Sequence, residues 1–356
     1  GRSCLLTPTH PPHFPHAALL LEAAWRLSRD PPERRPLHVL VLDTHNEAAR
    51  LCTEQPQVCR DAWPLREGGA DGARVALLTM DLLLREAGED WGQMEALRLS
   101  HAAAAEARGE DWRRAAFHRY GPCGTGWGQV YQGMKKLYGL AAARRSFGCE
   151  LTWVVDSESF PLRPFSFEEA FAAYRAEPWV QVQDYGGMRD CYGAPELLVQ
   201  ECTHWLITHK LRLASAGAIG YRPSDFWMYE NQRVEEFIED LRRTWGTHSF
   251  LDVWMRPPAH GEAMVLPPWL HLRHALGQPP AYGPRPEAQR QELPPLRALD
   301  VAAIVRAQLP ELYRAACQNS SAGTAVGAFE PGCAGDFAVV PRALRALGLP
   351  EEPAAL

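Results

Sequence analysis

The chain has 356 residues, of which 46% are hydrophobic, enough for one large domain or two smaller ones with a substantial core. Its formal net charge of −6 and pI near 6.1 provide no basic surface for a nucleic acid, so no nucleic-acid partner is expected. No apolar run approaches the roughly 20 residues of a membrane-spanning helix, so we expect membrane attachment only through an anchor absent from this chain.

The first part of the chain alternates between predicted strands and predicted helices. Strand, helix and strand in this order, with Asp43 directly after the second strand, is the opening of an α/β nucleotide-binding fold. The expected elements are a strand over 4–8, a helix over 17–27, a strand over 37–42, a strand over 75–80 and a charged, solvated helix within 86–114. The glycine-rich residues 120–126 predict a loop, either against a ligand or simply flexible, and they lack the Gly-Lys-Ser/Thr of a P-loop.

The most informative stretch is residues 127–165. It begins with an amphipathic helix, continues with an apolar run over 151–155 that predicts a buried strand, and then turns abruptly acidic at Asp156, Ser157 and Glu158. Two carboxylates two residues apart at a strand end can share one divalent cation. Such a cation can neutralise a diphosphate, and lysines of the preceding helix can reach the same charge.

Two expectations follow from charge and helix geometry. Lys135 and Lys136 are about 100° apart on a helix, so we expect only one of them, Lys136, to face inward. In the sequence after Asp156 and Glu158, no basic residue appears before Arg163, so these two carboxylates are expected to repel each other unless a cation is bound.

This stretch resembles the GT-A glycosyltransferases, and among them glycogenin-like and related bacterial and algal transferases. The resemblance covers about forty residues: Gln129-x-x-Gln132-x-x-Lys135-Lys136-Leu137, a spacer, the apolar strand, Asp156-x-Glu158 and Leu162-Arg163-Pro164-Phe165. It departs from the family in having Glu158 for a second Asp and in a longer spacer. An Asp-x-Glu after an apolar run is also common as a plain turn or solvated strand end.

The resemblance implies an α/β fold of the GT-A type, which is a Rossmann-like nucleotide-binding mixed sheet flanked by helices, here with a C-terminal helical extension. It implies a metal-dependent transferase in which Asp156 and Glu158 hold Mn²⁺ or Mg²⁺ and Asp156, Gln132 and Lys136 bind the nucleotide-sugar donor. Asp43 then meets the uridine or ribose, although it could equally cap the turn that follows it.

Acceptor-side residues are also suggested by the resemblance. Asp225 or Glu230 would take the proton of the acceptor hydroxyl, although a helix N-cap and a first-turn acid explain both residues without catalysis. A histidine from the C-terminal half would complete the metal site, and His271 is preferred over His260 and His274 because its surroundings are apolar.

The second half of the chain is expected to continue the domain to residue 276, followed by a proline-rich linker over 277–298 and an extension over 299–356. Ser166 and Glu169 form a capping box sequence. The expected elements are a helix to 175, a strand over 179–183, a helix over 195–210, a strand or loop over 214–221, a helix over 226–244 and a helix over 299–317.

Cysteines and a glycosylation sequence favour the secretory route. Nine cysteines leave at least one unpaired, while Cys52 with Cys59 and Cys317 with Cys333 are close enough to close loops. Asn319 begins an N-glycosylation sequon. We therefore expect the lumenal portion of a type II Golgi or secretory-pathway protein, with a cytoplasmic protein as the alternative.

The expected activity is transfer of a sugar from a nucleotide sugar, preferably a UDP-sugar, to a glycan or protein acceptor. A nucleotidyltransferase is the rival enzyme, but residues 5–14 lack the glycine-rich signature with a basic residue that such enzymes carry near the first strand. A carbohydrate-binding relative without catalytic activity is the other alternative.

Overall fold

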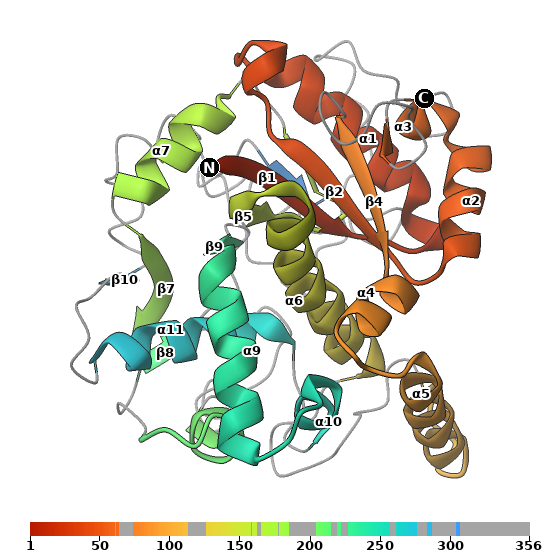
Figure 1. Ribbon diagram of the computed structural model, residues 1–356, viewed down its shortest axis with the longest axis vertical. Helices are drawn as coiled ribbons and strands as arrows, with labels where there is room; N and C mark the ends of the chain where they lie inside the picture. Colours follow the sequence, from red (N-terminus) through yellow and green to blue (C-terminus); the bar gives the residue numbers. More distant parts are fainter. Residues whose placement is uncertain are drawn as a thin grey trace, which may run out of the picture.

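A mixed six-stranded sheet lies at the centre of the molecule, in the order β3-β4-β2-β1-β5-β9 (Figure 1). The computed structural model describes residues 1–60, 62–63, 74–112, 126–157, 159–161, 165–176, 178–184, 204–214, 219–221, 227–256, 261–275, 283–286 and 304–306. Within them the predicted α/β architecture, a mixed sheet flanked by helices, is confirmed. No helix in these ranges combines the length and apolar character needed to cross a membrane.

Five of the six strands are parallel, and their apolar runs explain why. A strand buried on both faces has no polar side, so it appears in the sequence as a continuous apolar segment. The parallel strands are β1 (Arg2–Pro8), β2 (Leu37–Leu42), β3 (Ala62–Trp63), β4 (Val75–Thr79) and β5 (Cys149–Val154). The edge strand β9 (Trp227–Glu230) runs antiparallel to β5.

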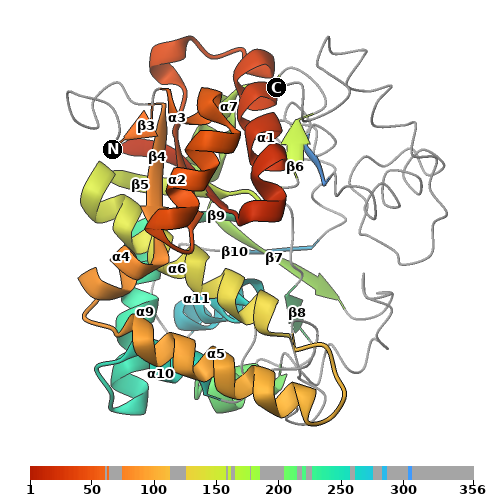
Figure 2. The same ribbon diagram turned by 90° about the vertical axis from the view of Figure 1, so that its right-hand side faces the viewer.

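Helices cover both faces of the sheet (Figure 2). Side chains of β2 alternate between the two faces, so Leu40 and Leu42 pack against the first group of helices, while Val39 and Val41 belong to the core on the other side. The first group is α1 (Phe14–Leu27), α2 (His45–Glu54) and α3 (Pro56–Cys59). The second includes α4 (Met80–Glu86), α6 (Trp127–Phe147) and α9 (Asn231–Trp245).

Helix α6 lies unusually close to the sheet. A Cβ atom at Gly139 would be 2.8 Å from Cγ2 of Val41 and 2.9 Å from Cδ1 of Leu6, so only glycine permits this approach. Gly133 has the same role further along the helix, because a Cβ atom there would lie 2.9 Å from the backbone N of Glu262. The two glycines thus allow α6 to contact β1 and β2 on one side and the 262–264 turn on another.

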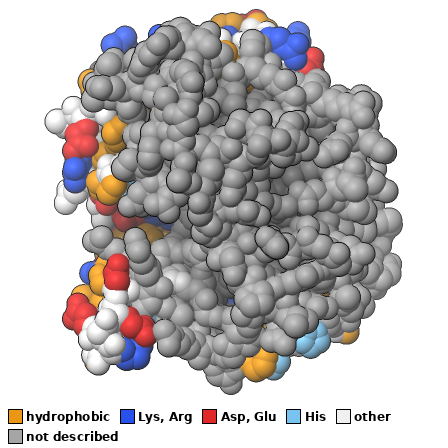
Figure 3. Space-filling model, turned by 180° about the vertical axis from the view of Figure 1, so that it is seen from behind, with side chains coloured by type: hydrophobic (Ala, Val, Ile, Leu, Met, Phe, Trp, Pro, Cys, Tyr) orange, Lys and Arg blue, Asp and Glu red, His pale blue; other side chains and the backbone are white. Residues whose placement is uncertain are grey.

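Helix α5 (Trp91–Glu106) extends away from the sheet and has a largely charged, solvated surface. Only Met94, His101 and Ala105 of this helix are buried. In the view from behind, acidic and basic side chains alternate at the lower left, over the region of α5 (Figure 3). The prediction of a solvated helix within 86–114 is confirmed for the described part.

A second layer lies against α6 and α9. It is held in place by the buried Lys210, which donates hydrogen bonds to the carbonyl oxygens of Val253, Trp254 (2.8 Å) and Arg256 (2.7 Å). These carbonyls lie at the carboxyl end of a helix, where carbonyl groups have few backbone partners, although Val253 also accepts from the backbone N of Arg256. The elements of this layer are η3 (Leu206–Lys210), α10 (Phe250–Met255), η4 (Glu262–Met264) and α11 (Leu266–Ala275).

The helix predicted from residue 226 begins later in the structure. Residues 227–230 are strand β9, paired with β5, and α9 begins only at Asn231. The reason is that Met228 and Tyr229 are buried against the edge of the sheet, and aromatic side chains suit a strand as well as a helix.

Two short strands lie where the sequence predicted a linker and a helix. Gly283–Pro286, in the predicted linker, forms β10 and pairs with β7 (Trp179–Asp184), which also pairs with β8 (Ile219–Tyr221). Ile304–Arg306, in a predicted helix, forms β11 and pairs with β6 (Ser159–Pro161). The β-branched Ile304 and Val305 favour that extended conformation. The remainder of 277–356 lies outside the described residues.

The predicted cap before α7 (Phe167–Ala176) is formed by Ser166, while the Glu169 carboxylate pairs with Arg29. The Ser166 hydroxyl accepts a hydrogen bond from the backbone N of Glu169 at 3.1 Å. The carboxylate of Asp30 adds a second acceptor, 2.6 Å from the backbone N of Phe167. An acid at a helix amino end is stabilising, so Asp30 fixes α7 beside α1.

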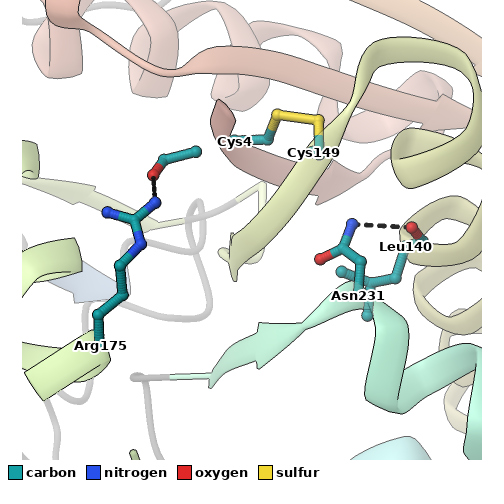
Figure 4. Close-up of a disulfide and its surroundings, with 6 residues drawn as sticks. Cys4, Leu140, Cys149, Arg175 and Asn231 are labelled. Carbon is teal, nitrogen blue, oxygen red and sulfur yellow. Dashed lines mark hydrogen bonds between the residues drawn. A yellow bond between two sulfur atoms is a disulfide. The ribbon is translucent and has the colours of Figure 1, made fainter. Parts of the chain in front are cut away.

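Two disulfides cross-link the described part of the chain. Cys52 and Cys59 are bonded as predicted, which ties α2 to α3. A second bond, which the sequence reasoning did not anticipate, joins Cys4 of β1 to Cys149 at the start of β5 (Figure 4). Cys317 and Cys333 lie outside the described residues.

Candidate functional site

A cleft of about 680 Å³ opens at the carboxyl ends of β1, β2 and β5. This is the edge at which open α/β sheets bind their ligands, and the volume is within the range of small-molecule sites. The loop after β1, Asp43 after β2 and Ser157 after β5 contribute to its lining. The amino-terminal half of α6 and one side of α5 provide the opposite wall.

Lys135 is the cation at the β1–β2 end of the cleft. Its ammonium group forms an ion pair with Asp43 and donates a hydrogen bond to the backbone O of Thr9 at 2.8 Å. It also lies 5.2 Å from the ring centroid of Tyr131. The prediction that Lys135 faces solvent is therefore wrong, since only 4% of this residue is exposed.

The Oγ1 atom of Thr9, at this end of the cleft, is buried and has no hydrogen-bond partner among the described residues. Thr9 and Tyr131 both line the cleft. Buried polar groups are normally satisfied, so the Thr9 hydroxyl is suited to bind a ligand or an ordered water. Burial, followed by the charge of Asp43 and a hydrogen bond with its carboxylate, raises the pKa of Tyr131 well above its usual value, so its hydroxyl stays protonated.

The carboxylates of Asp43 and Glu47 lie together at the amino end of α2. The Asp43 backbone N donates to Oε2 of Glu47 at 3.0 Å. Burial and, secondly, the charge of Asp43 raise the pKa of Glu47. The N-cap of α2 is Thr44, whose Oγ1 accepts from the backbone N of Glu47 at 3.3 Å, so Asp43 is not needed for capping.

Lys136 belongs to a buried cluster behind the cleft. Its Nζ atom is 3.1 Å from Oδ1 of Asp156 and 2.8 Å from Oε1 of Glu262. Gln132 donates to the same Asp156 oxygen at 3.1 Å. Lys136, Asp156 and Glu262 are each less than 5% exposed, and none of the three lines the cleft.

This cluster corrects two expectations. Both lysines are buried, because α6 is covered by the strand ends on one side and by the 262–264 turn on another, and each ammonium group finds a carboxylate there. Asp156 does not lack a cation either, since Lys136 reaches it from the preceding helix. The sequence contains no signal for Glu262, which lies 126 residues beyond Lys136.

The described residues do not by themselves form a metal site. Among them no group of three or more His, Cys, Asp or Glu side chains is arranged to hold a metal ion. A metal ion on Asp156 would share that carboxylate with the Lys136 ammonium, and like charges at such distances repel. Glu158, the other predicted ligand, lies outside the described residues, as does His260.

The structure does not bring the remaining predicted residues to the cleft. His271 is half-buried on α11 and does not join Asp156 in a group of three metal-binding side chains. Glu230 pairs with Leu151 near the start of β5, whereas Asp156 follows the end of that strand. Glu230 forms an ion pair with Arg233 at 3.6 Å and does not line the cleft, so its role as an acceptor-side acid stays a prediction. Asp225 lies outside the described residues.

A histidine cluster lies beside Ser157. The rings of His10 and His13 are 4.1 Å apart, those of His13 and His16 are 5.2 Å apart, and Nδ1 of His13 is 2.9 Å from Oγ of Ser157. His10, His13 and Ser157 line the cleft. The sequence reasoning missed this cluster, although histidines at three-residue intervals directly after a predicted strand are a visible signal.

Aromatic rings form the outer wall of the cleft. Trp127 and Tyr131 stack with their centroids 5.8 Å apart, and the guanidinium of Arg98 lies 5.6 Å from the centroid of the Trp112 ring. Trp91 also lines this wall. Flat aromatic faces suit nucleobases and sugar rings.

No protein-family model matches the sequence, and no curated protein matches it either. Among solved structures, the apo form of mouse xyloside xylosyltransferase 1 shares 11% sequence identity and a TM-score of 0.37, over 87% of this chain and 98% of that one. A likeness of this size is too low to support an argument, so the assignment of function depends on the cleft itself.

Proposed function

We propose that this chain is a glycosyltransferase that binds a nucleotide sugar, preferably a UDP-sugar, and transfers the sugar to a glycan or protein acceptor. The observation that carries the proposal is the cleft at the carboxyl ends of β1, β2 and β5. The lining of this cleft combines a lysine, two carboxylates, an unpartnered threonine hydroxyl and aromatic rings.

The nucleoside and the phosphates of a nucleotide sugar each have a suitable counterpart in this cleft. The carboxylate of Asp43, beside the protonated Tyr131 hydroxyl, can accept hydrogen bonds from ribose hydroxyls or a base N–H. The ammonium group of Lys135 lies between these groups and the β1 loop, where it can bind a phosphate.

The cluster behind the cleft has a positioning role in this proposal. Lys136 and Gln132 hold Asp156, and Ser157 follows it directly at the lining of the cleft. Mn²⁺ or Mg²⁺ stays a prediction, with Asp156 and Glu158 as its expected ligands. Asp225 likewise stays a prediction as the acceptor-side acid. Two disulfides support a chain that matures in an oxidising compartment such as the secretory lumen.

The test begins with a screen of UDP- and GDP-sugars by thermal shift and by donor hydrolysis, each with Mn²⁺ and with EDTA. We expect at least one nucleotide sugar to raise the melting temperature and to be cleaved. Release of pyrophosphate from a nucleoside triphosphate and a sugar phosphate would instead identify a nucleotidyltransferase. Binding of a glycan without cleavage of any donor would identify a carbohydrate-binding protein.

The variant Lys135→Met tests the cleft directly. A hydrogen bond to a charged group contributes about 1.5–3 kcal/mol, so loss of this ammonium should weaken UDP binding by at least tenfold in calorimetry. Arg50→Met, which removes an exposed cation of α2 outside the cleft, is the matched control and should leave affinity unchanged. Equal UDP affinity in Lys135→Met and wild type would contradict this assignment of the cleft.

A further inference from the structure

We infer that His10, His13 and His16, together with the hydroxyls of Ser157 and Thr9, form the binding site for the diphosphate of the donor. The inference deepens the proposed function and rests on it for the identity of the anion. That the β1–α1 connection can bind an anion follows from its own residues and does not depend on the proposed function.

The site is built where β1 ends and α1 begins. The first helical residue of α1 is Phe14, and His13 is its N-cap. The Phe14 N–H already donates to the Pro11 carbonyl and Pro15 has no N–H, so this helix end favours an anion through the positive end of its dipole rather than through those two backbone positions. The first turn of this fourteen-residue helix has no acidic residue that would satisfy that end.

The three imidazoles add side-chain donors to the same end. His10 contacts His13, and His13 contacts His16. His13 is also hydrogen-bonded to the hydroxyl of Ser157, which follows β5. A neutral imidazole donates one hydrogen bond and a protonated one donates two, so a histidine cluster can bind phosphate oxygens in either state. His10 and His13 line the cleft, and His16 supports them from the helix.

A second and independent observation points to a ligand here. Thr9, the residue before His10, is only 1% exposed, and its Oγ1 atom has no hydrogen-bond partner although the residue lines the cleft. A buried hydroxyl without a protein partner has lost its hydrogen bonds to water, and this costs free energy unless a bound ligand supplies a hydrogen bond.

Two carboxylates close to the proposed site are already paired with cations. Asp156, which precedes Ser157, is bound by Lys136 and Gln132, and Asp43, which lines the cleft, is paired with Lys135. Lys135 approaches from the other side, through its hydrogen bond to the Thr9 carbonyl. The diphosphate would therefore lie between His13 and Lys135, with the nucleoside toward Asp43.

The experiment titrates inorganic pyrophosphate, UDP and uridine into the full chain by calorimetry, with EDTA present. The variant His13→Asn removes the imidazole and keeps a residue that caps helices well. The matched control is His45→Asn, an exposed histidine at the start of α2 that does not line the cleft. We expect His13→Asn to weaken pyrophosphate and UDP binding at least tenfold and uridine binding less than twofold, and His45→Asn to change none of them.

Two further variants keep the test decisive. Ser157→Ala should weaken pyrophosphate binding three- to tenfold by releasing His13. His10→Asn changes an exposed cleft residue, so it tests the site even if His13→Asn does not fold, and a threefold or greater loss is expected. Unchanged pyrophosphate affinity in the folded variants would overturn the inference while leaving the proposed function standing if UDP and donor cleavage persist. Failure of the wild-type chain to bind UDP or any nucleotide sugar would instead overturn the proposed function.

Discussion

Replacement of Lys136 by methionine should destabilise this protein more than most single substitutions do. In the wild-type chain one ammonium group contacts the carboxylates of Asp156 and Glu262, both oxygens lying within 3.1 Å of the same nitrogen. Methionine fills a similar volume and removes the charge. Two buried carboxylates would then face each other with no cation between them, although Gln132 still donates to one of them.

The magnitude follows from the burial of all three groups. Removal of one partner of a buried ion pair costs about 3–5 kcal/mol, because the remaining charge is left uncompensated. A typical domain is stable by only about 5–15 kcal/mol, so the variant should lose a large fraction of its stability. Glu262→Gln should cost less than about 1.5 kcal/mol, since Asp156 and Lys136 still neutralise each other.

The assay is urea unfolding followed by circular dichroism, with Arg50→Met as the control. Arg50 forms an exposed pair with Glu54, for which about 1 kcal/mol or less is expected. The expected order of destabilisation is Lys136→Met well above Glu262→Gln and Arg50→Met. A loss below about 1 kcal/mol for Lys136→Met, or an equal loss for Glu262→Gln, would show that the cluster is not a buried charge network.

Three further predictions concern stability. Burial lowers the pKa of His38 to about 3. Below pH 6.5 the unfolded chain therefore binds a proton that the folded chain does not, and the free energy of unfolding should fall toward pH 3 by up to about 1.4 kcal/mol per pH unit. In urea unfolding at pH 7, 5.5 and 4.5, His38→Gln should lose less stability than the wild type, and an equal loss in both would contradict this. Gly139→Ala should destabilise by about 1–3 kcal/mol through overlap with the core, whereas Gly128→Ala, with open space around it, should not, and equal melting temperatures would argue against the close packing of α6. Double replacement of Cys4 and Cys149 by serine should cost about 2–5 kcal/mol, and an unchanged urea midpoint would speak against the bond.

The strands of the sheet were predictable because burial on both faces leaves a continuous apolar run. Residues 37–42 match β2 at both ends, and the run over 151–155 differs from β5 by two residues at its start and one at its end. Strand β9 was missed because its four residues directly precede an amphipathic helix and resemble that helix in apolar content. Only the pairing with β5 shows that they are a strand and not the first turn of the helix. Contacts between distant segments are not encoded in local periodicity.

Part of the candidate site was also predictable from the sequence. Asp43 was placed at a strand end by the order of the elements and Gln132 was suggested by the resemblance, and both line the cleft. The assignment of the two lysines failed because helical spacing gives only the angle between side chains, not what covers each side of the helix. Glu262 comes from a turn far along the chain, and the packing of Gly133 against its backbone, which no sequence pattern shows, brings it to Lys136.

The bond between Cys4 and Cys149 converts residues 4–149 into a covalent ring. A protease that cuts once anywhere within this ring leaves both fragments in one molecule, which migrates as a single band until a reductant is added. Because β2, β4 and α6 lie within the ring and β1 and β5 are joined by its closure, a nicked chain would keep every strand that borders the cleft. Oxidised protein should therefore tolerate cleavage that would divide the reduced chain into two separate polypeptides.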